Sequence, residues 1–384
     1  MRKLKVLYLT MESLDFDPII RSQVVPLINV LSSNKKLFSK ITLLTFEKAG
    51  HTLNEVQLNT GVEHISLIRC SNIYNQITLC RYIYENAYSY DVIHVRSYLP
   101  MVSTILLKKR HNCKIIFDPR GLYADEVLYY GDHKFLGYLF KLLERYFYNK
   151  SDNIVTVSSK FKKYLIERYF LEDKKITTIE TFSSKVNIQS LESSNMCIRR
   201  KLNWEDKTVL CYSGSLEAWQ LFDRVLEFFS LAEKNSDRFR FVFFSKSKPS
   251  MELLVSKVLP KNKYVVISAE PHELGPMMYE CDYGFLFREA HLINQVSAPI
   301  KFNDYLLSGL SIVLTDGIGD STCFINKTGL GIVIDDFSTS TYIDVISQLH
   351  KRSCIEKAET IERVLTERGL QYIAQKYLQL YSTI

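Results

Sequence analysis

The stretch Ser297–Gly309 gathers residue types that can bind an anion next to a polyol. Its Ser-Ala-Pro-Ile-Lys start predicts a helix near Pro299, because proline fits the first turn, where no amide hydrogen is needed. The free amides and positive dipole end of such a helix attract anions, and Lys301 adds a full charge. Asp304, one turn further, can accept hydrogen bonds from hydroxyl groups, and Gly309 is suited to end the helix. A nucleotide sugar carries both an anion and hydroxyls, although many α/β proteins have such a helix without a ligand.

A second candidate phosphate site is the turn Ser213-Gly214-Ser215, which follows the strand predicted over Thr208–Tyr212. Gly214 permits a tight turn, and the adjacent amides can surround a phosphate. Arg288 also follows a predicted strand and can add a positive charge there. The alternative interpretations are an ordinary turn and a solvated loop arginine.

Ionisable residues also cluster after two neighbouring strands predicted in the N-terminal half. The cluster consists of Arg96, Asp118, Arg120, Asp125 and Glu126. Ionisable groups at the ends of buried strands are candidates for catalysis, because burial and close pairing change their pKa values. Arg120 can stabilise phosphate or sugar hydroxyls, and Asp125 or Glu126 can accept a proton from a hydroxyl. The alternative is that Asp118 with Arg120, or Arg96 with Glu126, forms a structural ion pair; His94, inside a strand pattern, is expected to be a core residue.

The elements that must position these residues alternate along the chain. Apolar runs of strand length are separated by helical patterns, which indicates parallel sheets covered by helices on both faces. Every candidate above follows a predicted strand, and ligands of such sheets bind at the carboxyl ends of the strands. The polar stretch Val186–Arg200 has neither pattern, and we expect it to link an N-terminal domain, residues 1–187, to a C-terminal domain, residues 188–367.

Length and composition agree with a two-domain packed protein. The chain has 384 residues, of which 46% are hydrophobic, and two domains are the natural expectation for this length. No uncharged apolar run is long enough to cross a membrane, and the N-terminus does not resemble a signal peptide. The eight cysteines are scattered without a Cys-x-x-Cys pair, so neither zinc nor a disulfide framework is expected, and a cytoplasmic location is favoured.

The net charge of +7 is concentrated in one region. Lys134–Lys175 contains ten Lys and Arg residues against five Asp and Glu residues, and its apolar residues recur at helical spacing. One interpretation is a pair of surface helices with solvated basic faces. The other is a basic amphipathic surface that binds the anionic inner leaflet of a membrane. Nucleic acid is not favoured as a partner, because no binding motif accompanies the charge.

Five stretches, in order along the chain, resemble bacterial family-4-like glycosyltransferases of surface-polysaccharide synthesis. They are Asp91–Tyr98, Phe117–Glu126, Ser151–Ser158, Tyr212–Ser215 and Ser297–Asp320. The resemblance implies an α/β GT-B fold, with two doubly wound Rossmann-like domains facing across a cleft and a final helix, residues 368–384, that packs on the first domain. It also implies a retaining transfer from a nucleotide-sugar donor to a lipid-linked saccharide, as in the synthesis of lipopolysaccharide O-antigen or capsule. A location on the inner face of the plasma membrane would follow.

The resemblance assigns roles to the candidate residues. Those expected to bind the donor are Ser213, Gly214, Ser215, Arg288, Ser297, Pro299, Ile300, Lys301 and Asp304. Those expected near the reacting groups are Arg96, Asp118, Arg120, Asp125 and Glu126. No metal or cofactor is expected, because the departing phosphate can itself take the acceptor proton while cations and helix N-termini stabilise its charge.

Two departures from the family pattern keep other functions open. No basic residue follows the Ser213–Ser215 turn, and Val296 stands where the family carries an acidic residue eight positions before Asp304. A GT-B-shaped nucleotide-sugar epimerase or hydrolase, or a non-catalytic sugar-binding subunit of an assembly complex, therefore remains an alternative. A Rossmann oxidoreductase is disfavoured, because no Gly-x-Gly-x-x-Gly follows the first predicted strand, Lys5–Thr10.

Overall fold

The structure is a computed structural model that describes residues 2–50, 57–131, 133–183 and 198–384. The chain divides into two compact units: unit 1 comprises Met1–Thr181 and Leu370–Ile384, and unit 2 comprises Phe182–Gly369. The domain boundary expected at residue 187 lies outside the described residues, as does most of the predicted linker Val186–Arg200. The chain passes from unit 1 into unit 2 and later returns, so unit 1 is built from two separate segments.

Unit 1 contains a seven-stranded parallel sheet in the order β3-β2-β1-β4-β5-β6-β7. The strands are β1 (Leu4–Leu9), β2 (Phe38–Glu47), β3 (Val62–Ile68), β4 (Val92–Arg96), β5 (Lys114–Asp118), β6 (Asn153–Thr156) and β7 (Ile176–Thr178). All five residues of β4 are buried, as the near-continuous apolar runs of a doubly covered parallel sheet require. The order of the strands reverses between β1 and β4, so the segments after these strands leave the sheet in opposite directions.

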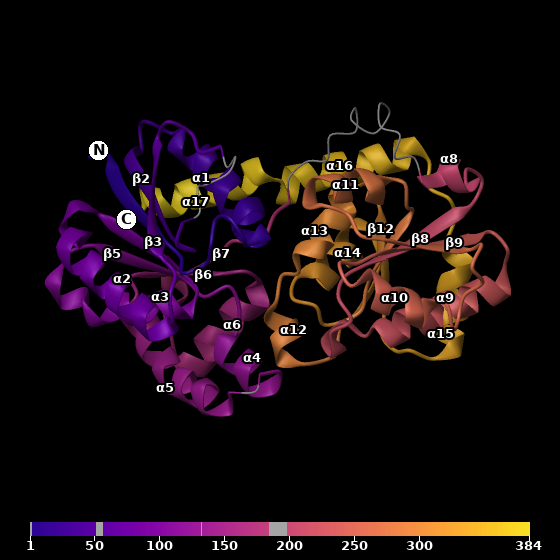
Figure 1. Ribbon diagram of the computed structural model, residues 1–384, viewed down its shortest axis with the longest axis horizontal. Coiled ribbons are helices and arrows are strands. Elements are labelled where there is room, and N and C mark those ends of the chain that lie inside the picture. Colours follow the sequence, from indigo (N-terminus) through magenta and orange to yellow (C-terminus); the bar gives the residue numbers. More distant parts are fainter. Residues whose placement is uncertain (1, 51–56, 132, 184–197) are drawn as a thin grey trace. The chain divides into compact units, whose positions relative to one another are not determined.

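Helices cover both faces of the unit 1 sheet (Figure 1). They are α1 (Val25–Ser32), α2 (Asn72–Asn86), α3 (Tyr98–Leu106), α4 (Tyr123–Tyr129), α5 (Lys134–Lys150), α6 (Ser159–Tyr169) and α17 (Leu370–Ser382). Helices α1 and α17 pack together, and α3 packs against both α2 and α5. A π-helical turn, Ile20–Val24, precedes α1.

Unit 2 contains a six-stranded parallel sheet in the order β10-β9-β8-β11-β12-β13. Its strands are β8 (Thr208–Ser213), β9 (Phe239–Phe244), β10 (Tyr264–Ile267), β11 (Tyr283–Leu286), β12 (Ser311–Thr315) and β13 (Gly331–Ile334). Its helices are α8 (Ile198–Leu202), α9 (Phe222–Asn235), α10 (Lys248–Val255), α11 (Pro271–Tyr279), α12 (Leu292–Val296), α13 (Ile300–Leu307), α14 (Ser321–Thr328), α15 (Thr339–Gln348) and α16 (Cys354–Arg368). Strand and helix alternate through the unit, as the sequence predicts.

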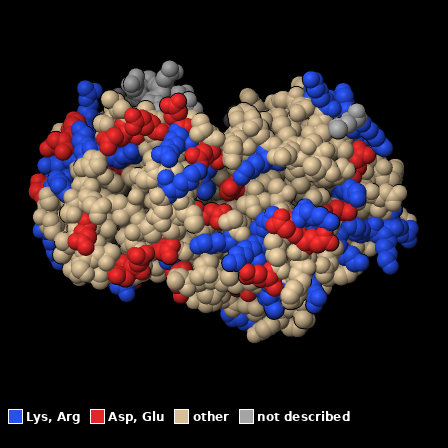
Figure 2. Space-filling view, turned by 180° about the vertical axis from the view of Figure 1, so that it is seen from behind, with Lys and Arg blue, Asp and Glu red and all other residues tan. Residues whose placement is uncertain are grey.

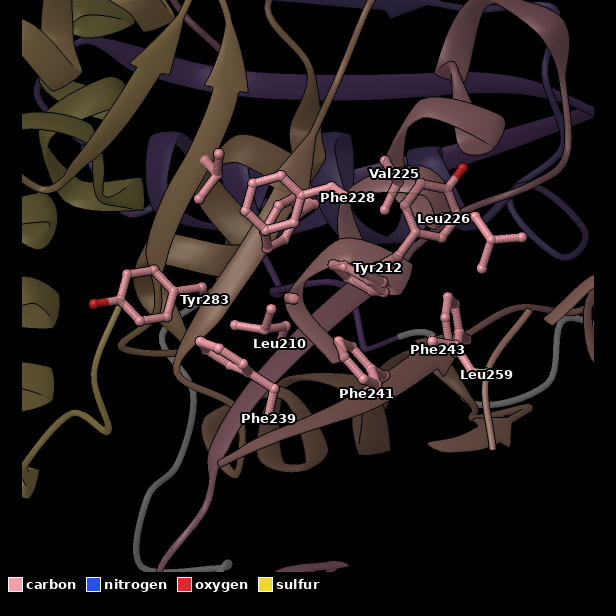
Figure 3. Close-up of a cluster of buried hydrophobic side chains, with 14 of the residues drawn as sticks. Leu210, Tyr212, Val225, Leu226, Phe228, Phe239, Phe241, Phe243, Leu259 and Tyr283 are labelled. Atoms are coloured by element: carbon pink, nitrogen blue, oxygen red, sulfur yellow. The ribbon is translucent and has the colours of Figure 1, made fainter. Parts of the chain in front are cut away.

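The sheet of unit 2 is packed on both faces. Phe241 and Phe243 of β9 face the core shared with α9, α10 and α15 (Figure 3), whereas Val242 and Phe244 face the core under α11, α13 and α14. This alternation follows from the two-residue period of a strand. Because both cores are continuous, the strand ends of the sheet are held in a rigid frame.

Charged side chains are mixed over much of the surface. On the face drawn in Figure 2, lysines and arginines are interspersed with acidic residues. On α6, for example, Lys162 contacts Asp173 at 2.9 Å and Lys163 lies 3.8 Å from Glu167. In the described parts of the chain, no helix combines the length and the apolar character that a bilayer crossing requires.

Candidate functional site

Helix α13 is fixed to the sheet of unit 2 by one aromatic side chain. The ring of Tyr305 lies directly over Gly284 of β11, where even a Cβ atom would overlap the ring. The Tyr305 hydroxyl accepts a hydrogen bond from the backbone N–H of Ser213, at 2.8 Å, and lies 3.3 Å from the carbonyl of Phe285. Tyr305 therefore links α13 directly to β8 and β11.

The predicted turn at the end of β8 lies beside the predicted cation of α13. The Lys301 ammonium donates to the side-chain oxygen of Gln220 at 2.5 Å and lies next to Gly214. Any Cβ at Gly214 would overlap both the Lys301 ammonium and Gln220 Oε1. The absence of a side chain at this turn therefore makes room for a lysine, and the structure brings Ser213, Gly214 and Lys301 together.

Two ionisable groups on α13 have strongly changed pKa values. Burial lowers the pKa of Lys301 to about 7, and the nearby Arg288 guanidinium lowers it further while Asp304 opposes the shift. Burial raises the pKa of Asp304 to about 6, although the Ser183 hydroxyl and Lys301 favour its charged form. Ser183 donates a hydrogen bond to Asp304 Oδ1. Desolvated groups of opposite charge within one helical turn are typical of functional sites.

The residues around the start of α13 form a compact junction. Helix α12 ends at Val296, Ser297 donates its hydroxyl to the carbonyl of Asn294 at 2.9 Å, and α13 begins at Ile300 with Pro299 as its N-cap residue. Four apolar residues of this helix, Phe302, Tyr305, Leu306 and Leu307, are all buried.

Gly309, which is predicted to end the helix, and Gly317, which follows the next strand, both have left-handed backbones. Gly309 follows α13 with a φ of 78°, and Gly317 follows β12 with a φ of 79°. The amide of Gly319 bonds to the carbonyl of Asn294 at 3.2 Å, so the loop after β12 rests on α12. Arg288 joins the same edge through its amide, which bonds to Thr315 Oγ1 at 2.9 Å.

The predicted cluster of unit 1 centres on Asp118, whose side chain is fully buried at the end of β5. One oxygen of its carboxyl group lies 3.4 Å from the Arg120 guanidinium, 3.9 Å from that of Arg96 and 3.8 Å from His94 Nε2. Burial alone would raise the pKa of Asp118, but Arg120, His94 and Arg96 together lower it to about 2. Arg120 adopts a φ of 66°, which a non-glycine residue rarely does and which turns the chain directly after the strand.

Further residues complete this cluster. Arg96 Nε lies 3.5 Å from Glu12, which follows β1. His94 is a buried core residue, as predicted, and its Nδ1 lies 2.7 Å from the hydroxyl of Tyr381 on α17. Burial raises the pKa of the neighbouring Tyr8 to about 12. Glu12 is not among the residues predicted for this cluster, although it follows a predicted strand in the same way as the other candidates.

Asp125 and Glu126 are placed differently from the other three candidates of unit 1. The Asp125 carboxylate lies 2.5 Å from the Lys141 ammonium of α5. Glu126 is solvent-exposed, and a Cβ at Gly121 would lie 2.8 Å from its Oε1. Desolvation by nearby protein atoms and the adjacent Asp125 raise the pKa of Glu126. The structure therefore joins Arg96, Asp118 and Arg120 in one cluster, whereas Asp125 forms an ion pair with Lys141 of α5.

Sequence reasoning missed Gln220 and Ser183, which contact the two ionisable groups of α13. Both contacts join residues far apart in the chain, and neither residue belongs to a recognisable motif. Within the described residues, no group of three or more His, Cys, Asp or Glu side chains is placed to hold a metal ion.

Comparison with known proteins gives a family match in unit 1. Residues 39–182 match the model of Glycosyltransferase Family 4, a segment that runs from β2 to the start of unit 2. No curated protein matches the sequence. The family match therefore concerns the unit with the Asp118 cluster, and it supports glycosyl transfer.

Solved structures resemble the chain over both units. Sucrose-phosphate synthase from Thermosynechococcus elongatus has a TM-score of 0.70 at 13% identity, with 100% of this chain and 99% of that chain covered. HepE from Anabaena, in complex with UDP-glucose, has a TM-score of 0.66 at 11% identity, with 99% and 100% covered. The fold is that of the GT-B glycosyltransferases. WaaG, a glycosyltransferase involved in lipopolysaccharide biosynthesis, is also similar in structure. Its TM-score is 0.64 at 14% identity, with 98% of this chain and 99% of that chain covered.

Proposed function

We propose that the protein transfers a sugar, with retention, from a nucleotide-sugar donor to a saccharide acceptor. The observation that carries the proposal is the group formed by Lys301, Arg288 and Asp304 beside the Ser213–Ser215 turn in unit 2. The family match in unit 1 and the GT-B fold support the same reaction class. The finding that HepE binds UDP-glucose in this fold makes a nucleotide sugar the natural donor to test.

In this proposal unit 2 binds the donor. Lys301 and Arg288 attract the diphosphate, together with the amides of the Ser213–Ser215 turn and the first turn of α13. The Asp304 carboxylate accepts hydrogen bonds from the hydroxyls of the nucleotide ribose. The Asp304 side chain is one methylene shorter than that of a glutamate. Ser183 already donates a hydrogen bond to this carboxylate. When the ligand binds, the carboxylate must therefore accept hydrogen bonds from both the ligand and Ser183, or the ligand must displace Ser183.

The chemistry needs no further cofactor in this proposal. The bond between the sugar C1 and the phosphate oxygen breaks, a bond forms from C1 to the acceptor oxygen on the same face, and the acceptor proton passes to the departing phosphate. Lys301 and Arg288 stabilise the charge that develops on that phosphate. Arg120 and Asp118 act on the acceptor side, where Asp125 or Glu126 is the alternative to the departing phosphate as acceptor of the proton.

The acceptor in this proposal is a lipid-linked saccharide, as in the synthesis of lipopolysaccharide or capsule, and unit 1 rests on an anionic membrane surface. Within the basic region Lys134–Lys175, the structure favours α5 over α6. The exposed face of α5 carries Phe135, Tyr138, Leu139, Leu142 and Tyr146 together with Lys134, Arg145 and Lys150. Apolar side chains flanked by cations are suited to the headgroup region of a bilayer, whereas Lys162 and Lys163 of α6 lie near acidic residues.

Calorimetric titration with UDP, GDP and ADP tests the donor site. Asp304→Asn and Lys301→Ala should each weaken binding of the best nucleotide about ten- to a hundredfold, because each removes a charge-assisted hydrogen bond. Circular dichroism should show that both variants stay folded. Failure of the wild type to bind any of the three nucleotides, or wild-type affinity in both variants, would overturn the donor site.

Turnover distinguishes a transferase from its alternatives. Release of nucleoside diphosphate from the matching nucleotide sugar should require a lipid-linked acceptor. A hydrolase would release it without the acceptor, and a sugar-binding subunit would not release it at all. Arg120→Ala and Asp118→Asn should lower turnover far more than donor affinity; normal turnover in both would assign these residues a structural role.

A further inference from the structure

We propose that Gln220 is a positioning residue for Lys301, which it holds at the Ser213–Ser215 turn to receive the diphosphate of the donor. The inference rests on the proposed function. It gives a role to Gln220 near a turn that no basic residue directly follows in the sequence. Gln220 ends a short 3₁₀ turn, Ala218–Gln220, which follows the Ser213–Ser215 turn closely in the chain. Its side chain is buried, so its contacts are fixed by the surrounding protein.

Both ends of the Gln220 amide have partners, which fixes its orientation. Its Nε2 donates to Ser215 Oγ at 2.5 Å, and the hydroxyl of Tyr212 lies 3.0 Å from its Oε1. The oxygen must therefore face Lys301, because the nitrogen is engaged by the turn. The same tyrosine hydroxyl lies 2.6 Å from the carbonyl of Ser215, so the amide and the turn move as one unit.

The backbone after Gln220 supports the same geometry. Leu221 adopts a φ of 45°, a left-handed conformation that residues with a Cβ atom rarely adopt because it is sterically unfavourable. The next residue, Phe222, begins α9 and packs in the core beside the ring of Tyr212, with ring centroids 5.0 Å apart. The core thus holds a strained residue next to Gln220, which is expected where the surrounding structure determines a functional geometry.

An uncharged partner suits a lysine that must bind phosphate. The charged groups that face Lys301 are Arg288, after β11, and Asp304, on its own helix. A carboxylate at position 220 would neutralise the ammonium and repel the diphosphate, whereas an amide oxygen orients it and leaves its charge available. Gly214 completes the arrangement, since a side chain there would displace both Gln220 Oε1 and the ammonium.

The test measures the affinity for UDP, GDP and ADP between pH 7 and pH 9. In this range the nucleotide phosphate, with a second pKa of about 6, and Asp304 are both ionised. Because the pKa of Lys301 is about 7, wild-type affinity should fall as the pH rises and the ammonium is lost. Tyr212 stays protonated, since burial raises its pKa.

Two substitutions move this pH profile in opposite directions. Gln220→Leu removes the acceptor, so affinity at pH 7.5 should fall about tenfold and the midpoint should move to lower pH. Gln220→Glu stabilises the ammonium, so the midpoint should move to higher pH. Gln348→Leu, at the exposed end of α15 in the same unit, is the matched control and should change neither quantity.

A double-mutant cycle separates positioning from a general effect on the fold. In the Lys301→Met background, the pH dependence should vanish and Gln220→Leu should cost no further affinity. An unchanged midpoint in both Gln220 variants, or an equal loss of affinity with and without Lys301, overturns the inference while the donor site stands. If the wild type binds none of the three nucleotides, the proposed function itself is overturned. If Gln220→Leu does not fold, the midpoint of Gln220→Glu decides alone.

Discussion

Asp304 lowers the stability of the folded protein above pH 6, because its carboxyl group is buried. Its carboxyl group is desolvated by burial, and the Ser183 hydroxyl donates a hydrogen bond to it. The folded protein therefore holds a proton on this group at a pH where an unfolded chain has already released it. In the proposed function, the hydroxyl groups of the bound donor supply the hydrogen bonds that stabilise the buried Asp304 carboxylate.

The stability of the protein should record this cost. The pKa of Asp304 is about 6 in the folded protein against an ordinary 3.8, so the unfolded chain binds fewer protons between these values, and stability falls as the pH rises from about 4 to 6. At pH 7, Asp304→Asn should therefore stabilise the protein, by about 1–3 kcal/mol, because each unit of pKa is worth about 1.4 kcal/mol. Urea unfolding at pH 7 and pH 5 measures the effect, which should shrink at the lower pH. An equal effect at both pH values would contradict the burial of this charge.

At the scale of elements, α13 depends on its contact with the sheet. Tyr305→Phe should lower the free energy of unfolding by about 1–2 kcal/mol, because it leaves the buried amide of Ser213 without its partner. It should also weaken nucleotide binding, since the turn and the helix lose their common anchor. Urea unfolding and calorimetry measure the two effects.

Tyr264→Phe is the matched control for this substitution. Tyr264 lies on β10 of the same sheet, and among the described residues its buried hydroxyl makes no hydrogen bond. Removing that hydroxyl should be neutral or slightly stabilising. If both tyrosine variants lost the same stability, the anchoring role of Tyr305 would be refuted.

The exposed face of α5 allows a separate prediction at this scale. Leu142, with 80% of its side chain exposed, should enter the headgroup region when unit 1 binds a membrane, and Leu142→Glu should weaken binding to phosphatidylglycerol vesicles at least tenfold. Sedimentation with the vesicles measures binding. Lys163→Glu on α6 is the control and should have a much smaller effect, because Lys163 lies near Glu167. Equal binding of the Leu142 variant and the wild type would leave α5 as a solvated face.

At the scale of the whole molecule, the two units should respond separately to damage in one of them. Tyr381 of α17 packs edge-on against Phe38 and contacts His94, so Tyr381→Ala should destabilise unit 1 by about 3–5 kcal/mol. Trp204 and Trp219 are the only tryptophans, and both belong to unit 2. The circular dichroism transition should therefore move to lower temperature while the tryptophan fluorescence transition stays in place.

A control on the same helix makes the result specific. Tyr372 is partly exposed on α17, and Tyr372→Ala should leave both transitions near their wild-type positions. If the tryptophan signal shifted as far as the circular dichroism signal in the Tyr381 variant, the two units would unfold together, and the prediction would fail.

Much of this architecture could be predicted because it depends on local patterns. Buried runs such as Val92–Val95 and Leu310–Thr315 indicate parallel strands, and the alternation with helices indicates the fold. The Ser213–Ser215 turn could be predicted from the apolar run before it, and the helix that carries Lys301 from its proline and glycine. The partners of these residues could not be predicted in the same way: Lys301 meets Gln220 across 81 positions and Asp304 meets Ser183 across 121, and such contacts depend on the register of packed elements.

The return of the chain from unit 2 to unit 1 also has a consequence for synthesis on the ribosome. The strands of unit 1 emerge first, but α17, which covers α1 and contacts His94 on β4, emerges only after all of unit 2. At roughly 5–20 residues per second, this interval is on the order of 10–40 s. During that time the apolar side chains that α17 will cover are exposed to water. The unit that is synthesised first is therefore the last to be completed. We expect the nascent chain to depend most on chaperones in this interval.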